Sequence, residues 1–134
     1  GIDRPPDWEG NPLTSDSHAA RSHILMETFC RGNVLFEHRP LYMGVRSRSH
    51  KYLWKEYRDH RDQFSRDSHE LYDLDVDPEE SINIFRPDHP VVLQFNPIIA
   101  ERLAEIPEMP AERIVAAFGK VGEDALRRHR RAGS

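Results

Sequence analysis

The stretch that decides the fold is residues 41–57, which read LYMGVRSRSHKYLWKEY. Its first part alternates, with Leu41, Met43 and Val45 on one side, as in a strand that buries one face. Residues 47–49 are polar, and aromatic residues then recur at every second position. The stretch predicts an antiparallel β-hairpin, in which aromatic cross-strand pairs contribute ~0.2 to 1 kcal/mol each.

Further strands are predicted on both sides of this hairpin. Residues 22–30 alternate between an apolar and a mixed face, which is typical of a strand. Residues 58–68 are nearly all polar and predict an exposed loop. Residues 70–74 predict a short strand in which Leu71 faces a core and Tyr72 the opposite side. An Asp-Pro pair then ends that strand, because proline lacks a ladder donor and restricts the residue before it.

Helices are predicted in the last third of the chain. Asn96 and Pro97 form a helix start, since asparagine caps and proline fits the first turn, and this helix should end near Pro107. Apolar residues keep helical spacing within it, at Ile98, Ile99, Leu103 and Ile106. One more helix is predicted from the spacing of Ile114, Phe118, Val121 and Ala125.

That last helix is predicted to be weak. Gly119 and Gly122 each cost ~1 kcal/mol relative to alanine in a helix interior, and residues 127–131 are expected to fray. Strands followed by helices indicate an α+β fold. We therefore expect a small antiparallel β-sheet of about four strands with the C-terminal helices packed on it.

Length and composition narrow the class of protein. At 134 residues the chain has the size of one domain. Its 19 basic and 23 acidic side chains give a formal charge of -4, which argues against nucleic acid as a partner. No apolar run approaches the ~20 residues of a membrane span, and no signal-peptide pattern is present. One cysteine excludes an internal disulfide framework, and the cellular compartment stays undetermined.

Three motifs occur in order along the chain. Val-Arg at 45–46 and Lys-Tyr at 51–52 are followed by Glu-Leu-Tyr-Asp-Leu at 70–74 and by DPEESIN at 77–83. This order resembles the C-terminal subdomain of the sulfatase family, of the arylsulfatase or N-sulfoglucosamine sulfohydrolase kind, in the alkaline-phosphatase-like superfamily. Residues 1–13 are similar to a passage that follows the active-site strands in that family. The resemblance implies a small antiparallel sheet with a helix against it, beside an α/β catalytic domain.

The resemblance also implies a chemistry that this chain does not carry. Sulfatases hydrolyse sulfate esters or sulfamates with a formylglycine made from a Cys-x-Pro-x-Arg segment, and usually with calcium. Cys30, the only cysteine, has neither the proline nor the arginine at those positions. We assign no catalytic, cofactor-binding or metal-ligating residue and expect the chain alone to be inactive. A sulfatase catalytic domain, covalently attached or separate, is the expected partner.

This resemblance divides the chain into three parts. Residues 1–21 are predicted to be a loop or crossing segment after a missing catalytic domain. Residues 22–106 form the sulfatase-like subdomain, and residues 107–134 are predicted to be the weak helix and a basic tail.

A basic cluster at the hairpin end is the candidate site. It consists of Arg46, Arg48, His50 and Lys51. Guanidinium and ammonium groups hold sulfate well, and the resemblance places this subdomain at the border of the substrate cleft, so the cluster would bind a sulfated substrate. The simpler interpretation, which we favour, is a solvated hairpin end with ion pairs to Glu56 or Glu70.

Other constellations have structural interpretations. Asp73, Asp75 and Asp77 begin like a calcium-binding EF-hand loop, but Pro78 and Ile84 stand where that loop needs glycine and glutamate, so a capped turn is predicted. Among the eight histidines, His18 and His23 have the closest spacing for zinc, without a cysteine pair.

The remaining candidates are the cysteine, the aromatics and the C-terminal arginines. Cys30 is predicted to be a small buried side chain. Tyr52, Trp54 and Tyr72 fit a core or cross-strand packing better than a sugar-stacking surface. Arg127, Arg128, Arg130 and Arg131 form a basic tail, for which contact with an acidic partner is one interpretation and a disordered end the simpler one.

Three functions remain open from the sequence. The chain is an accessory, cleft-forming part of a sulfatase-like hydrolase, a stand-alone module that binds sulfated or phosphorylated ligands, or a non-functional gene fragment. The fragment would expose an apolar face where a catalytic domain should pack.

Overall fold

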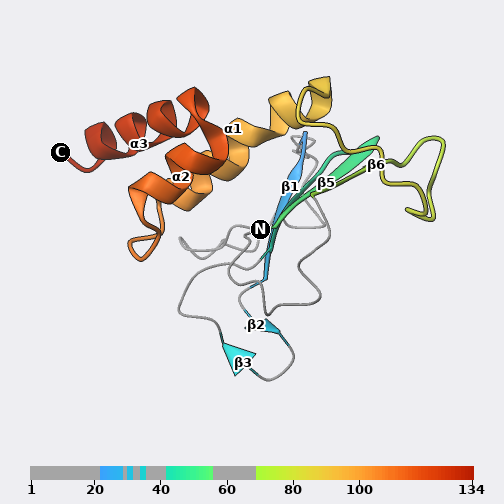
Figure 1. Ribbon diagram of the computed structural model, residues 1–134, viewed down its shortest axis with the longest axis horizontal. Coiled ribbons are helices and arrows are strands. Elements are labelled where there is room, and N and C mark those ends of the chain that lie inside the picture. Colours follow the sequence, from blue (N-terminus) through green and yellow to red (C-terminus); the bar gives the residue numbers. More distant parts are fainter. Residues whose placement is uncertain (1–21, 29, 32–33, 36–41, 56–68) are drawn as a thin grey trace, which may run out of the picture.

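The computed structural model describes residues 22–28, 30–31, 34–35, 42–55 and 69–134. In this part of the chain a four-stranded antiparallel sheet has the order β1-β4-β5-β6 (Figure 1). The strands of this sheet are β1 (Ile24–Thr28), β4 (Tyr42–Arg46), β5 (His50–Lys55) and β6 (Glu70–Asp73). A separate two-stranded ribbon pairs β2 (Cys30–Arg31) with β3 (Val34–Leu35). The predicted loops at residues 1–21 and 58–68 lie outside the described residues.

The register of the hairpin follows its alternation. Val45 lies opposite Tyr52 and Met43 opposite Trp54, and Tyr52 lies opposite Leu71 of β6. Directly opposed residues share a face, so these side chains gather on one side of the sheet. All five are buried. The predicted hairpin and the inward position of Leu71 are therefore confirmed.

Helices cover that apolar side of the sheet. α1 (Pro90–Ala104) contacts β4 and β5, and α2 (Ala111–Phe118) and α3 (Lys120–Ala132) pack on α1 and on each other. The sheet and the helices thus form two layers, consistent with the predicted α+β fold (Figure 1). Among the described residues, no helix is long and apolar enough to cross a membrane.

The predicted start of the first helix is wrong. α1 begins at Pro90, where the Nδ1 atom of His89 accepts a 3.2 Å hydrogen bond from the Val91 N–H, and Pro97 lies inside the helix. Pro97 removes one backbone donor. The apolar stripe of α1 nevertheless continues through it, because buried residues precede and follow it at Val92, Phe95, Ile99, Ala100 and Leu103. Burial of this stripe outweighs the missing hydrogen bond.

The predicted last helix is two helices. Gly119 has φ 54° and ψ -128°, so the chain turns there between α2 and α3. Glycine adopts a positive φ without the Cβ clash that penalises other residues. The expected fraying of residues 127–131 is also wrong, since α3 continues to Ala132. Basic side chains near a helix C-terminus are favoured by the helix dipole, and Arg128 bonds to Glu101 of α1 at 2.7 Å.

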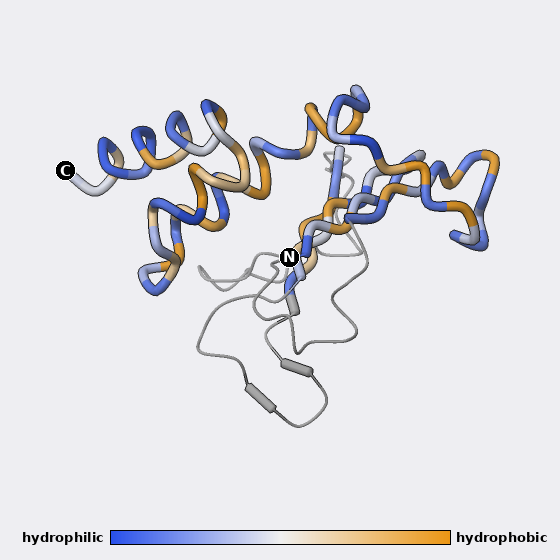
Figure 2. The backbone as a smooth tube through the Cα atoms, in the orientation of Figure 1, coloured by the Kyte–Doolittle hydropathy of each residue, from blue (hydrophilic) through white to orange (hydrophobic). Residues whose placement is uncertain are grey.

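One continuous core joins the two layers. Figure 2 shows hydrophobic residues along the strands, α1 and α2, whereas α3 is mostly hydrophilic. Trp54 contacts Phe118 of α2 with ring centroids 5.5 Å apart. Tyr52 is 1% exposed, and burial raises the pKa of its hydroxyl. The prediction that Tyr52 and Trp54 belong to a core is confirmed.

Candidate functional site

The ends of three strands meet at the predicted basic cluster. β4 ends at Arg46 and β5 begins at His50, and the register places Arg46 opposite Lys51 and His50 opposite Asp73. These strands and the turn after β6 bring five side chains together. We call this set the hairpin-end cluster: Arg46, His50, Lys51, Asp73 and Glu80.

Glu80 neutralises the inner cations of the hairpin-end cluster. Lys51 Nζ lies 2.5 Å from Glu80 Oε2, and Arg46 Nη1 lies 3.6 Å from Glu80 Oε1. The Lys51 and Glu80 side chains are 21% and 25% exposed, so this pair is partly shielded from water. The predicted ion pair with Glu70 is wrong, because Glu70 pairs with Lys55 instead. Lys55 Nζ lies 2.5 Å from Glu70 Oε1. Glu56 lies outside the described residues.

A capped turn presents Glu80 to the hairpin. The Asp77 carboxylate accepts hydrogen bonds from the Ser81 N–H at 3.1 Å, the Ser81 hydroxyl at 2.8 Å and the Ile82 N–H at 2.8 Å. These bonds lower the pKa of Asp77. The same turn holds Glu80 at φ 56°. The prediction of a capped turn is confirmed.

Asn83 ties this turn to β6. Its Oδ1 atom accepts hydrogen bonds from the N–H groups of Leu71 and Phe85, each at 3.0 Å, and its Nδ2 atom donates to the His69 carbonyl at 3.2 Å. The sequence motifs contained Glu80 and Asn83, but no role was predicted for either. Their role is to join segments that the motifs left separate.

The outer part of the hairpin end keeps some positive charge. The Arg46 side chain is 47% exposed, and Arg48 is exposed without an ion-pair partner in the described part of the chain. His50 Nε2 lies 3.9 Å from Asp73 Oδ2, and His50 Nδ1 bonds to Ser49 Oγ at 2.9 Å. Among the described residues of the hairpin, the unpaired Arg48 and the exposed part of Arg46 therefore offer positive charge to an anion.

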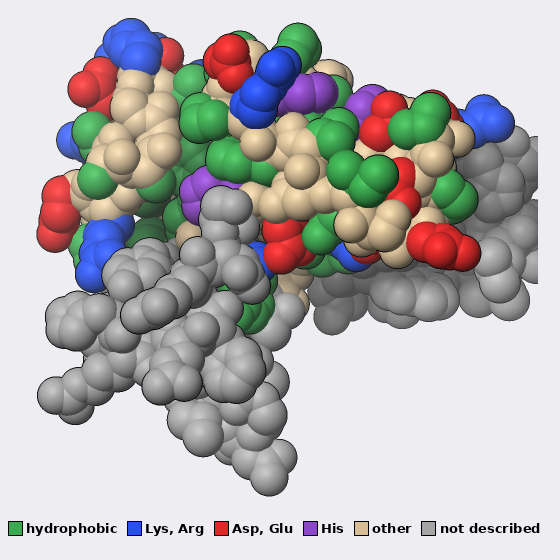
Figure 3. All heavy atoms as spheres, turned by 45° about the vertical axis from the view of Figure 1, so that its right-hand side comes forward, with side chains coloured by type: hydrophobic (Ala, Val, Ile, Leu, Met, Phe, Trp, Pro, Cys, Tyr) green, Lys and Arg blue, Asp and Glu red, His purple; other side chains and the backbone are tan. Residues whose placement is uncertain are grey.

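Acidic side chains on the neighbouring turn weaken the attraction of an anion to Arg46 and Arg48. Figure 3 brings the connection between β6 and α1 forward and shows acidic side chains among hydrophobic ones. Five carboxylates lie within eight residues of sequence, at Asp73, Asp75, Asp77, Glu79 and Glu80. No three His, Cys, Asp or Glu residues of the described ranges are grouped so as to hold a metal ion. The cluster is thus a charged structural joint with a weakly basic outer edge.

His69 lies in an aromatic cluster that was not predicted. Its ring stacks on Trp54 at 6.2 Å and meets Phe85 edge-on at 5.2 Å. Its Nδ1 atom accepts a 3.1 Å hydrogen bond from the Lys55 N–H, which places the proton of the neutral ring on Nε2. Burial, with a further contribution from Lys55, lowers the pKa of His69. A cavity of about 260 Å³ lies beside it, against α2.

The other predicted candidates have separate places. Tyr72 donates a 3.1 Å hydrogen bond to Glu70, and burial with this bond raises its pKa. His23 bonds to Ser22 Oγ at 2.9 Å. His18 and the Cys30 side chain lie outside what the structure describes. The arginines of the predicted tail lie on α3, away from the hairpin end.

Comparison with known proteins gives no relative. No protein-family model matches this sequence, no characterised protein is detectably similar to it, and no solved structure matches its fold.

Proposed function

We propose that this chain is the C-terminal portion of a sulfatase-like hydrolase, an accessory subdomain beside a catalytic domain that hydrolyses sulfate esters or sulfamates. One observation carries the proposal: the three motifs that resemble the family are bonded to one another. Glu80 of the third motif pairs with Lys51 and Arg46 of the first. Asn83 of the third motif holds β6, which carries the second.

This bonding gives the motif order a physical reason. Each motif supplies a group that another motif needs, so they depend on one another in one small structure. The two-layer α+β arrangement is also what the resemblance implies for such a subdomain.

The chain's contribution to catalysis would be indirect. Formylglycine and calcium do not fit the described residues, since Cys30 lacks the required neighbours and no metal-ligating group is present among those residues. Its described residues offer Arg48 and the exposed part of Arg46 as an outer rim that attracts a sulfated substrate.

The sheet face opposite α1 has a partly exposed apolar surface that suits a neighbouring domain. Ile24, Leu53 and Tyr72 share this side with the paired charges of Lys55 and Glu70, as the register requires. Ile24 is 55% exposed, and Leu53 and Tyr72 are half-buried. Among the described residues, no helix lies on this face. A surface that mixes apolar and paired charged side chains is typical of contacts between domains.

The test begins with the native protein in its source, detected with an antibody against residues 69–134. We expect a product much heavier than 15.7 kDa that hydrolyses an aryl sulfate after immunoprecipitation. The purified chain alone should hydrolyse none at any calcium concentration. A native product near 15.7 kDa that precipitates without sulfatase activity would overturn the proposal, as would hydrolysis by the purified chain.

A stand-alone module for sulfated or phosphorylated ligands is the second candidate, favoured by the exposed Arg48. Retention on heparin at low salt should then fall for Arg48→Ala more than for Lys51→Ala, because Glu80 already neutralises Lys51. Absence of retention at low salt would exclude this function.

A further inference from the structure

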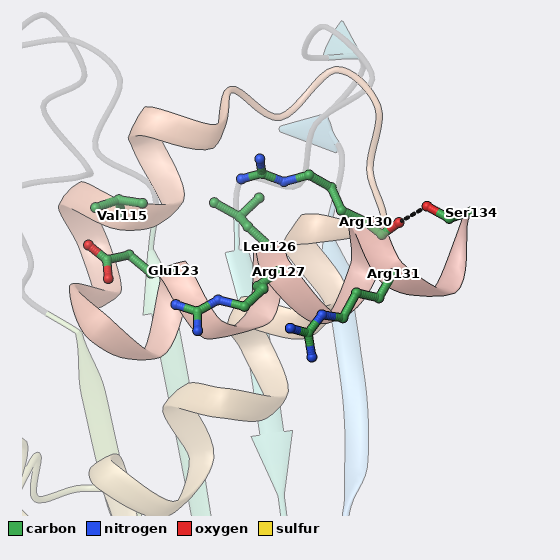
Figure 4. Close-up of a pocket in the computed structure, with 7 residues that line it drawn as sticks. All are labelled: Val115, Glu123, Leu126, Arg127, Arg130, Arg131 and Ser134. Carbon is green, nitrogen blue, oxygen red and sulfur yellow. Dashed lines mark hydrogen bonds between the residues drawn. The ribbon is translucent and has the colours of Figure 1, made fainter.

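A groove with an apolar and a charged wall lies between α2 and α3 (Figure 4). Its volume is about 490 Å³. The apolar wall comes from Val115 of α2 and Leu126 of α3, and the charged wall from Glu123, Arg127, Arg130 and Arg131. Nothing in the proposed function uses this groove.

The spacing of α3 sets the order of these groups. Residues four apart lie on the same side of a helix, so Arg130 follows Leu126 along one row and Arg131 follows Arg127 along the next. In Figure 4 Arg130 lies on one side of Leu126, and Arg127 and Arg131 lie on the other. An apolar side chain is therefore flanked by guanidinium groups on both sides.

The charges of the groove are only partly balanced. Arg127 bonds to Asp124 at 3.4 Å, and Glu123 lies 3.8 Å from Lys120. Arg130 and Arg131 are exposed and have no carboxylate within ion-pair distance in the described ranges. By contrast, Arg128 faces away from the groove and bonds to Glu101. Two guanidinium groups at the apolar wall thus remain available to a ligand.

The apolar wall narrows the class of ligand. Val115 and Leu126 are only partly buried, so the apolar wall of the groove offers apolar surface to a ligand. Sulfated glycans and nucleic acid backbones present little apolar surface to such a wall. A peptide combines carboxylates with an apolar side chain and suits both walls.

We propose that the α2–α3 groove binds an acidic peptide segment of a partner protein. One apolar side chain of the segment lies on Leu126 and Val115, and carboxylates on both sides of it bond to Arg130 and Arg131. This interaction is independent of the proposed sulfatase relationship, because it uses none of the motif residues.

The test is a binding measurement on the whole chain by fluorescence anisotropy. The probe is a labelled peptide, Glu-Glu-Leu-Leu-Glu-Glu, compared with one in which serine replaces leucine and one in which glutamine replaces glutamate. The chain should bind the first peptide at low salt, and both altered peptides should bind at least about tenfold more weakly. Rising salt should weaken binding of the first peptide.

Variants locate the site. The double variant Arg130→Ala/Arg131→Ala should lose at least about tenfold in affinity, since it removes two charge-assisted hydrogen-bonding groups. Arg128→Ala on the same helix is the matched control and should keep affinity within about twofold. Circular dichroism should show unchanged helix content in both, because these side chains are exposed.

Three results would overturn the proposal. The first is no binding of the leucine peptide at low salt. The second is equal binding of the serine peptide, which would mean a general anion surface suited to a glycan. The third is equal loss of affinity in the Arg128→Ala control.

Discussion

The hairpin-end cluster and the α2–α3 groove are both basic in sequence, but the fold treats their charges differently. At the hairpin end, Lys51 and Arg46 share Glu80 and help to hold a turn against the sheet. In the groove, Arg130 and Arg131 have no carboxylate partner among the described residues. Cations that the fold neutralises stabilise it, and cations that it leaves unpaired are available to ligands.

The largest effect is expected from a substitution that disrupts the contact between α2 and α3, and with it the groove. A Cβ added at Gly122 would lie 2.6 Å from the Ile114 carbonyl oxygen, which is backbone and cannot move aside. We expect Gly122→Ala to lower the free energy of unfolding by about 3 kcal/mol, measured by urea denaturation, and to abolish peptide binding. Gly133→Ala is the control, because its added Cβ would make only an ordinary contact at 3.8 Å. Equal stability of the two variants would contradict this account of the α2–α3 contact.

The next largest loss of stability is expected when the hydrogen bonds between the motifs are removed. Asn83→Ala removes three hydrogen bonds to backbone groups and should cost about 2 kcal/mol in unfolding free energy. Asn96→Ala makes the same substitution where the buried Oδ1 atom has no hydrogen-bond partner in the described part of the chain. It should change stability by no more than about 0.5 kcal/mol. A larger loss from Asn96→Ala than from Asn83→Ala would refute the assigned role.

Removal of the shared carboxylate should have a smaller effect. Glu80→Gln leaves Lys51 and Arg46 without a counter-charge and should cost about 1 kcal/mol, since the pair is partly shielded. Glu79→Gln changes an exposed neighbour and should stay within about 0.5 kcal/mol. Chemical denaturation at low and high salt should bring the two variants together as salt rises.

Acid should weaken the sheet and leave the groove charged. The pKa of His69 is lowered on folding, so the unfolded chain binds a proton that the folded chain resists. Stability from this group is full above its ordinary value of 6.5 and is lost as pH falls through the lowered, folded value. The measurement is urea denaturation across this range. His69→Gln should flatten the slope, while the arginines of the groove stay charged throughout.

The smallest effect sharpens the comparison from the groove side. Arg130→Ala/Arg131→Ala should alter unfolding free energy by no more than about 0.5 kcal/mol while losing peptide affinity. A loss of stability as large as that of Glu80→Gln would mean that the two basic regions do not differ.

Local patterns in the sequence predicted the elements whose signals are local. The alternation of residues 42–55 gave the hairpin, and Leu71 faced the core as period two required. The predicted start of α1 was wrong because Asn96 and Pro97 offer the same capping signal as His89 and Pro90. Only burial of the longer apolar stripe decides between the two starts. The turn at Gly119 needed a backbone angle that spacing alone does not reveal.

The candidate site was predicted in part. Its cations were found because they are neighbours across a hairpin, but their partner Glu80 is 29 residues from Lys51 and reaches it through a turn. Shorter separations of 12 and 14 residues hid the contacts that Asn83 makes with Leu71 and His69, and the bond from Lys55 to His69. Contacts between residues far apart in sequence depend on the conformation of the turns between them. Local residue patterns do not predict that conformation.

Glu80 has an evolutionary consequence through its backbone. A glutamate at φ 56° carries a steric cost of roughly 1–2 kcal/mol that glycine avoids. Under mutation, position 80 should therefore drift toward glycine or asparagine wherever its carboxylate has no task. Sequences descended from a common ancestor with this chain should keep an acid at position 80 only when positions 46 or 51 keep a cation. The left-handed residue would then serve as a historical record of which charges the hairpin has needed.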